Sequence, residues 1–148
     1  MSDTPTFNIE KIYVKDLSLE IPNAPTIFLD RETPQIEVGL ETESAKFDDG
    51  IFEVVLRVTV SAKIGDKMMF LIETKQAGIF QINNIPSEEL GPIFGVVCPN
   101  ILFPYVRETI SDIITRAGFP PVLLAPVNFE ALYQQHLKNN ESRIVVTH

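Results

Sequence analysis

Strict alternation of apolar and polar positions marks the most regular segment of the chain, Ile51 to Ile64. The apolar positions are Phe52, Val54, Leu56, Val58, Val60, Ala62 and Ile64. A period of two is typical of a β-strand with one buried and one solvated face. Gly65-Asp66 then supplies a two-residue hairpin turn, so a returning strand is predicted over Met68 to Ile82.

Two earlier strands are predicted, one near Gln35 to Thr42 and one over Phe7 to Ile21. In the strand predicted over Phe7 to Ile21, the alternation of apolar and polar residues changes phase twice. Its apolar residues are odd-numbered at Phe7 and Ile9, even-numbered at Ile12 and Val14, and odd again at Leu17, Leu19 and Ile21. One extra residue switches the face that a strand presents, so each change of phase predicts a bulge or a bend.

The pattern becomes helical after Pro86. Apolar residues recur there at spacings of three and four: Val106, Ile110, Ile113, Ile114 and Ala117. Gly118 and Pro120-Pro121 end this helix, and Asn128 is a good N-cap for a final one. The predicted fold is α+β, a four-stranded antiparallel sheet followed by two helices packed on one face. A single domain covers residues 1–148, with loose ends at about 1–6 and 139–148.

The predicted sheet has more apolar surface than two short helices can cover. The fourth strand is apolar on both sides, with Phe70 and Ile72 on one and Met69 and Leu71 on the other. Contiguous exposed apolar surface usually marks association, so a homo-oligomer with residual exposed grooves is predicted. A monomer with a somewhat apolar surface is the alternative.

Composition and charge narrow the classes of partner and the compartment. Apolar residues make up 45% of the 148 residues, charged residues 22%, and the formal net charge is −8. This charge argues against a nucleic-acid partner and favours basic ones. We expect no apolar run long enough to span a bilayer and no signal peptide. The single cysteine, Cys98, fits a reducing cytoplasm.

Catalytic and metal-binding chemistry finds no support in the sequence. The two histidines, His136 and His148, lie outside any metal-ligand spacing, and Cys98 reads as a small core hydrophobe. No glycine-rich loop precedes a Lys-Ser/Thr pair that could hold phosphates. We therefore expect neither an enzyme nor a bound cofactor or metal.

One acidic group is a candidate binding site. Alternation places Asp16, Ser18 and Glu20 on one face of the first strand, and Leu71 and Glu73 on one face of the fourth. If these strands are neighbours, the result is an acidic, partly apolar patch on the open side of the sheet. A solvated face without function is the alternative to a docking site for a basic partner.

Several stretches carry a family likeness. They are YVKDLSLEIPNAP (Tyr13 to Pro25), FEVVLRVTV (Phe52 to Val60), AGIF (Ala77 to Phe80), CPNILFPYVRE (Cys98 to Glu108) and LAPVNFEALY (Leu124 to Tyr133). In these the chain resembles SecB, the bacterial protein-export chaperone. The resemblance implies an ATP-independent chaperone, a homotetramer built as a dimer of dimers, that holds precursor proteins unfolded and delivers them to SecA, the motor of the Sec translocase.

The resemblance also implies two sets of site residues. The positions that match the SecA-binding face of the family are Asp16, Glu20, Leu71 and Glu73. Candidate residues of a client groove between the helices and the crossover loop are Phe28, Val38, Leu40 and Tyr133. Phe103 joins them as part of a wall of aromatic and aliphatic side chains from Asn100 to Tyr105, which begins a helix because proline is tolerated in a first turn. Burial of this wall between subunits or in the core is the alternative.

Three positions depart from the family pattern, and two other functions stay open. Glu32 stands where the family often has tryptophan, the tail lacks the acidic, glycine-containing character of the family, and Gly91-Pro92 predicts a loop or broken turn before Cys98. The alternative functions are a SecB-like chaperone dedicated to one client, such as an antitoxin, and a carrier of small apolar ligands.

Overall fold

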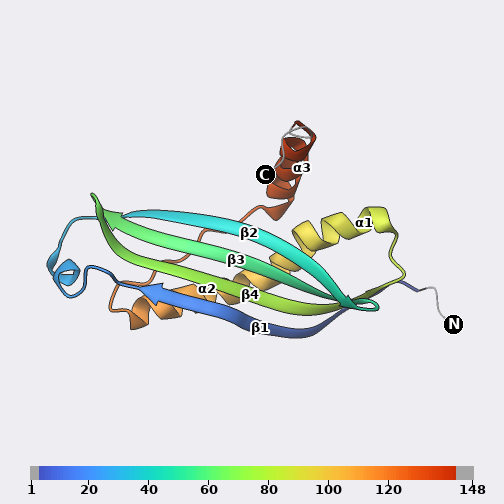
Figure 1. Ribbon diagram of the computed structural model, residues 1–148, viewed down its shortest axis with the longest axis horizontal. Coiled ribbons are helices and arrows are strands. Elements are labelled where there is room, and N and C mark those ends of the chain that lie inside the picture. The colour runs from blue at the N-terminus through green and yellow to red at the C-terminus, as the bar shows by residue number, and fades with distance from the viewer. Residues whose placement is uncertain (1–3, 143–148) are drawn as a thin grey trace.

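The computed structural model describes residues 4–142, in which four antiparallel strands form one sheet. The order across the sheet is β1-β4-β3-β2, so the first and last strands of the sequence are neighbours, with β1 and β2 at the two edges (Figure 1). The strands are β1 (Thr6–Glu20), β2 (Gln35–Asp48), β3 (Ile51–Ile64) and β4 (Lys67–Asn83). β3 has the predicted bounds, whereas β2 continues six residues beyond the prediction because it pairs with β3 over its whole length.

Both changes of phase in β1 are β-bulges. The register against β4 shifts between Ile9 and Lys11 and again between Val14 and Asp16. These shifts fall where the apolar residues change from odd to even numbers and back. The prediction from alternation is therefore confirmed, and every apolar residue from Phe7 to Leu19 that follows this pattern lies on the same face.

The core lies between this face of the sheet and one long helical stretch. α1 (Ser87–Pro92), a wider π turn η2 (Ile93–Val97) and α2 (Cys98–Arg116) follow one another without a break. The buried stripe of α2 packs on β3 and β4. Its members with no exposed area are Cys98, Leu102, Val106, Ile110 and Ile114.

The predicted interruption at Gly91-Pro92 is wrong. Pro92 lacks the N–H that a regular helix needs, but the π turn directly after it accommodates the irregularity and the helix continues. Pro99 and Pro104 consequently lie inside a continuous helical stretch rather than in a first turn. The segment Asn100 to Tyr105 continues this stretch and does not begin it.

The same stretch corrects the expectation about apolar length. Residues Ser87–Arg116 are long and apolar enough, by length and composition, to cross a bilayer. The apolar stripe of α2 is occupied by packing against the sheet, as in the core helix of a globular domain.

The last helix, α3 (Phe129–Ser142), has the predicted cap but not the predicted packing. Asn128 Oδ1 accepts a hydrogen bond from the Ala131 N–H at 2.9 Å, which confirms the N-cap. α3 packs on η2 rather than along the sheet, and it stands clear of the strands in Figure 1. Its apolar residues Phe129 and Tyr133 find their partners on helices, which is why the prediction of two helices on one sheet face holds only for α2.

The crossover from β1 to β2 contains a single 3₁₀ turn, η1 (Thr26–Leu29). Its Ile27 is buried in the core. Of the ends predicted to be loose, residues 1–3 and 143–148 lie outside the described residues. Among residues 4–142, β1 begins at Thr6 and α3 ends at Ser142.

Candidate functional site

The open face of the sheet, opposite α2, brings the four predicted docking residues together. Directly opposed residues of neighbouring strands share a face, and Glu20 opposes Leu71 while Ser18 opposes Glu73. One pair further along, Asp16 opposes Lys75. Because β4 turns its even-numbered residues to the core, these odd-numbered partners face outward. Asp16, Glu20, Leu71 and Glu73 therefore form one patch on two adjacent strands, which we call the acidic patch.

Arg57 of β3 ties part of this face together. One guanidinium nitrogen lies 3.0 Å from Glu73 Oε2 and another lies 3.3 Å from Glu41 Oε1 of β2. The hydrogen bond to Glu73 and the charge of Glu41 raise the pKa of Arg57, so it stays protonated. Sequence reasoning missed this residue. The available signal was a lone arginine on the polar face of a strand, but its partners depend on strand order.

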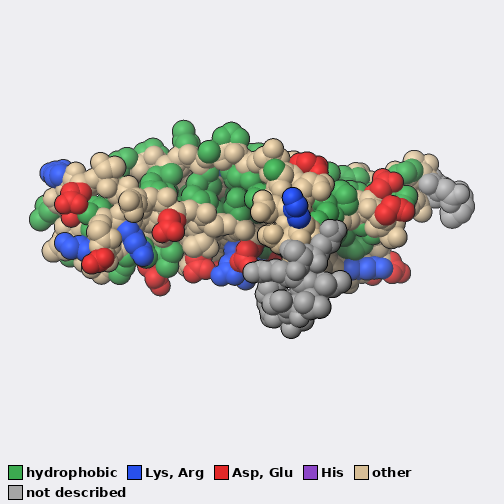
Figure 2. All heavy atoms as spheres, turned by 90° about the horizontal axis from the view of Figure 1, so that it is seen from above, with side chains coloured by type: hydrophobic (Ala, Val, Ile, Leu, Met, Phe, Trp, Pro, Cys, Tyr) green, Lys and Arg blue, Asp and Glu red, His purple; other side chains and the backbone are tan. Residues whose placement is uncertain are grey.

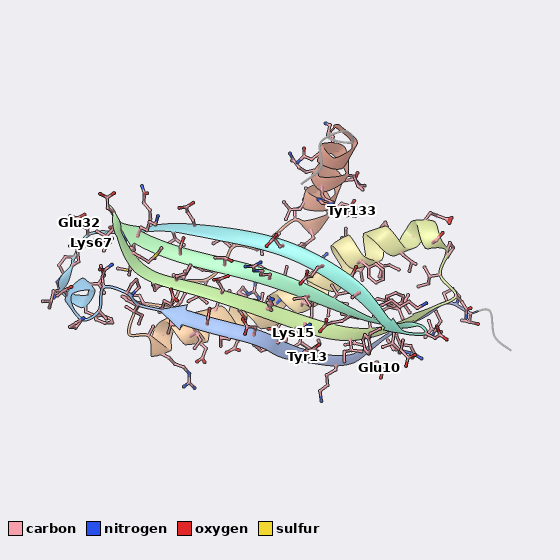
Figure 3. The ribbon with its side chains drawn as sticks, in the orientation of Figure 1. Glu10, Tyr13, Lys15, Glu32, Lys67 and Tyr133 are labelled. Carbon is pink, nitrogen blue, oxygen red and sulfur yellow. The ribbon has the colours of Figure 1, made fainter. Side chains whose placement is uncertain are left out.

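A second group on the open face consists of Tyr13, Lys15 and Glu53. Tyr13 and Lys15 lie close together on β1 (Figure 3). Lys15 Nζ lies 2.8 Å from Glu53 Oε1, and the Tyr13 hydroxyl donates to the same carboxylate. Burial pushes the pKa of Glu53 upward, but the hydrogen bonds from Lys15 and Tyr13 outweigh it and leave the pKa below its ordinary value. Glu53 is therefore a carboxylate whose charge is already matched.

These pairings leave part of the acidic patch unmatched. Within residues 4–142, neither Asp16 nor Glu20 has a basic side-chain nitrogen within the 4.0 Å of an ion pair. Lys15 is next to Asp16 in sequence but binds Glu53 instead. A cationic group of a partner would therefore meet two unpaired carboxylates beside the apolar Leu71.

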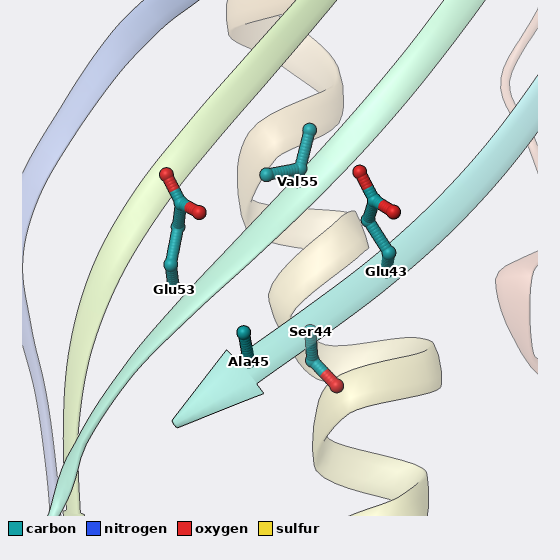
Figure 4. Close-up of a pocket in the computed structure, with 5 residues that line it drawn as sticks. All are labelled: Glu43, Ser44, Ala45, Glu53 and Val55. Atoms are coloured by element: carbon teal, nitrogen blue, oxygen red, sulfur yellow. The ribbon is translucent and has the colours of Figure 1, made fainter. Parts of the chain in front are cut away.

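A shallow hollow lies further along the same face. It is lined by Glu43, Ser44, Ala45, Glu53 and Val55 and opens outward (Figure 4). Two of its five lining residues are carboxylates, and its apolar floor is small. It differs in this from the closed apolar cavity that a carrier of small apolar ligands needs.

Replacing Tyr13 with phenylalanine is expected to remove the last step of the alkaline phenol titration. Burial, the hydrogen bond to Glu53 and the charge of that carboxylate raise the pKa of Tyr13 to about 12. A pKa raised on folding adds stability that is fully present below the unfolded value of about 10 and is lost as the pH rises through the folded value. The advantage of the parent over Tyr13→Phe in denaturant unfolding should thus shrink between pH 10 and pH 12. A single phenol step near the ordinary pKa in the parent would contradict this.

The five candidate groove residues do not meet in one place. Val38 and Leu40 lie on the core side of β2, where α2 leaves the strand uncovered, and Val38 is 47% exposed. Phe28 of η1 stacks on Phe119, beyond the end of α2, with ring centroids 4.9 Å apart. Tyr133 of α3 lies against Gly91 and Gly95, where an added Cβ would come within 2.4 Å of its ring or hydroxyl.

Phe103 is part of the core rather than of an open wall. It is 6% exposed, and its ring contacts Phe129 edge to face with centroids 5.8 Å apart. The side chain therefore supports α3 from beneath. Arg107 lies over the outer side of the same ring, 5.8 Å from its centroid.

Exposed apolar side chains follow the two edge strands and the outer helix surface. Seen from above, hydrophobic side chains gather in a band along the molecule, with most acidic and basic side chains at its lower edge (Figure 2). The exposed large residues on the strands are Ile9, Val14 and Leu17 of β1 and Ile36, Val38 and Phe47 of β2. On the side seen in Figure 2, the apolar band and most of the charged side chains thus occupy different areas.

Catalytic chemistry is not organised in the described part of the chain. Among residues 4–142, no group of three His, Cys, Asp or Glu side chains could hold a metal ion. Cys98 has no exposed area, and burial raises the pKa of its thiol to about 12, so the reactive thiolate is absent at neutral pH.

The described part of the chain presents two binding surfaces, the acidic patch and the exposed apolar side chains, and the comparisons with known proteins assign the chain to a class, the protein-export chaperones. A family model described as "Preprotein translocase subunit SecB" matches residues 1–140. The chain belongs to the SecB family of protein-export chaperones. Family membership makes it a non-enzymatic chaperone of the Sec export pathway and implies precursor proteins and SecA as partners.

Individual relatives agree with this assignment. "Protein-export protein SecB" of Chromobacterium violaceum is 65% identical over 131 residues, covering 88% of this chain and 87% of the relative. The protein of the same name from Thiobacillus denitrificans is 53% identical and covers all of both chains. Among solved structures, a Mycobacterium tuberculosis SecB-like chaperone in complex with a ChAD peptide from the HigA1 antitoxin has a TM-score of 0.67 and 18% identity, and covers 82% of this chain and 87% of its own. At that identity it shares the fold.

Proposed function

We propose that the chain is an ATP-independent cytoplasmic holdase that keeps precursor proteins unfolded and presents them to SecA through the acidic patch. The observation that carries this proposal is the separation of two surfaces. Asp16, Glu20, Leu71 and Glu73 lie together on the open face of β1 and β4, whereas the exposed apolar residues of the strands lie on the other face and at the edges. A precursor and SecA can then bind at the same time.

The unmatched carboxylates fit a basic segment of SecA. Attraction between opposite charges speeds the encounter and fixes the register of docking, and Leu71 supplies an apolar contact at the centre of the acidic patch. The ion pair with Arg57 offsets part of the negative charge of Glu73, whereas Arg57 forms no ion pair with Asp16 or Glu20. The strongest contacts of a cation are therefore with the β1 side of the patch.

Precursor binding is assigned to the apolar surface. Phe28, Val38, Leu40 and Tyr133 supply exposed or half-exposed apolar contacts at separate points, and Phe103 supports them from the core. Each contact alone holds an unfolded chain weakly. Several such sites joined in one assembly raise avidity by about 10²–10⁴ without any new contact.

The assembly that we propose is a homotetramer, built as a dimer of dimers. It is supported by the two long edge strands, which carry exposed apolar side chains that a monomer would leave in water. Self-association buries part of this surface and leaves the rest for clients.

Light scattering of the native protein tests both parts of the proposal. The expected mass at micromolar concentration is four times the 16.6 kDa of one chain, and it should rise by the mass of one precursor when a denatured precursor is diluted into the solution. The same precursor in its folded form is the matched control and should not bind. A monomer that ignores the denatured precursor would contradict the proposal.

A further inference from the structure

Two buried polar side chains on β4 lie on the wrong side of the sheet for polar groups. Thr74 and Gln76 face the core, where they are 0% and 3% exposed. A buried hydroxyl or amide is unfavourable unless it forms hydrogen bonds. Their apolar neighbours on the same face of β4 are Ile72 and Phe80, both without exposed area. Packing alone therefore does not account for them.

Both side chains donate to the backbone of β1. The Thr74 hydroxyl lies 3.3 Å from the carbonyl oxygen of Asp16, and Gln76 Nε2 lies 3.2 Å from the carbonyl oxygen of Tyr13. These carbonyls bracket the second bulge, in which Lys15 is the extra residue between the pairs Val14–Gln76 and Asp16–Lys75. A bulge disrupts the regular ladder, so its backbone groups need partners from elsewhere.

This bulge decides which residues of β1 reach the open face. Tyr13 faces outward, opposite Ala77, and regular alternation from there would turn Asp16 and Glu20 toward α2 and Leu17 outward. The extra residue reverses this. It also leaves Lys15 on the open side, where it binds Glu53 and not its neighbour Asp16.

We propose that Thr74 and Gln76 are positioning residues of the SecA-docking surface, which hold the β1 bulge and thereby aim Asp16 and Glu20 at the partner. The inference rests on the proposed function of the acidic patch and extends it to residues on the opposite face of the sheet. Neither side chain touches the partner. Each acts through the backbone of the strand that carries the contact residues.

Both substitutions remove a donor and leave its acceptor in place. Thr74→Val and Gln76→Leu leave the carbonyl oxygens of Asp16 and Tyr13 without these hydrogen bonds, which is destabilising for a buried group. Gln76→Leu also removes Gln76 Oε1, which is buried and has no hydrogen-bond partner among the described residues, and this offsets part of the loss. The denaturant midpoint should therefore fall modestly while docking weakens; a purely structural role would lower the midpoint and leave docking unchanged.

The experiment compares the full-length protein with Thr74→Val, Gln76→Leu and the double variant. Titration calorimetry with purified SecA should show affinity about tenfold lower for the double variant, since two hydrogen bonds that order the docking strand are lost. Amide hydrogen exchange of residues 14–18 should become at least several-fold faster, with exchange in α2 unchanged. Thr74→Ser keeps the hydroxyl and should bind SecA as the parent does.

Deleting Lys15 provides a matched control. It removes the bulge residue while Asp16 stays opposite Lys75, so the faces of Asp16 and Glu20 are preserved. In this background the double substitution should no longer affect SecA affinity. Continued weakening there would show that Thr74 and Gln76 act by another route and would overturn the inference.

An Asp16→Ala arm separates failure of the inference from failure of the proposed function. If Asp16→Ala weakens SecA binding but the double variant binds as the parent does, the inference is wrong and the docking surface stands. If Asp16→Ala has no effect, the docking assignment itself is wrong, and the inference falls with it. Native mass is measured for each variant, so that affinities are compared at equal oligomeric state.

Discussion

Replacing Asp16 with lysine is expected to abolish SecA binding while leaving the capture of unfolded precursors intact. Asp16 is one of two carboxylates in the acidic patch that have no basic side-chain nitrogen within 4.0 Å among residues 4–142, although Lys75 lies opposite it on β4. Reversal replaces an attractive contact by a repulsive one, and truncating one partner of a charge pair that is buried and hydrogen-bonded in an interface already costs about 2–5 kcal/mol. The affinity for SecA should fall at least about thirtyfold. Calorimetric titration with SecA, beside binding of a denatured precursor, measures both properties.

Asp49→Lys is the matched control for this reversal. It makes the same change in net charge, but Asp49 lies in the β2–β3 turn at another end of the sheet and is fully exposed. If both variants lost SecA binding equally, overall charge and not the acidic patch would account for the loss. If Asp16→Lys lost SecA and precursor together with its mass unchanged, the separation into two surfaces would be wrong.

Glu73→Lys is also expected to abolish SecA binding, and it tests in addition how far Arg57 offsets the charge of Glu73. Glu73 already pairs with Arg57 at 3.0 Å, so a lysine there places two cations side by side. SecA binding should be lost as for Asp16→Lys. Glu73→Gln, which removes the charge without this repulsion, should weaken binding less than Asp16→Asn, because part of the charge of Glu73 is matched within the protein.

Replacing Leu102 with alanine is expected to lower the free energy of unfolding by about 2–5 kcal/mol. Leu102 lies in the N-terminal half of the buried stripe of α2 and has no exposed area. Its side chain also fills the space above Gly78 of β4, so truncation opens a void between helix and sheet. Denaturant unfolding, fitted together with native mass, measures the loss.

Leu29→Ala makes the same chemical change where 76% of the side chain is exposed. It should change the free energy of unfolding by less than about 0.5 kcal/mol. Equal effects of the two substitutions would mean that α2 is not the element that closes the core.

Much of the acidic patch could be predicted from local patterns. The phase changes in β1 predicted the two bulges, because turning apolar side chains from the core to the solvent face of a half-buried strand is unfavourable in free energy. Asp16 and Glu20 could therefore be assigned to the open face before any strand order was known. What alternation left conditional was the neighbour of β1, which pairing in the structure identifies as β4.

The groove residues were less predictable, for a physical reason. Whether Phe103 is wall or core depends on Phe129, twenty-six residues further along the chain. The position of the Tyr133 ring depends on Gly91 and Gly95, which lie close to it only because α3 packs back against η2. Gly91-Pro92 was read as a break because local propensity is against helix there, and the π turn and the packing of α2 override it.

By itself, the amino-acid sequence determined the strands, the bulged phase of β1, the cap at Asn128 and the family. These depend on side chains close together in the chain, whose periodicity and chemistry can be read directly. Only the tertiary structure decided that β1 lies beside β4, that Arg57 joins Glu73 to Glu41, and that Lys15 and Tyr13 share Glu53. Those side-chain contacts join residues 16 to 40 positions apart, and their free energy is gained only when distant strands meet in one register.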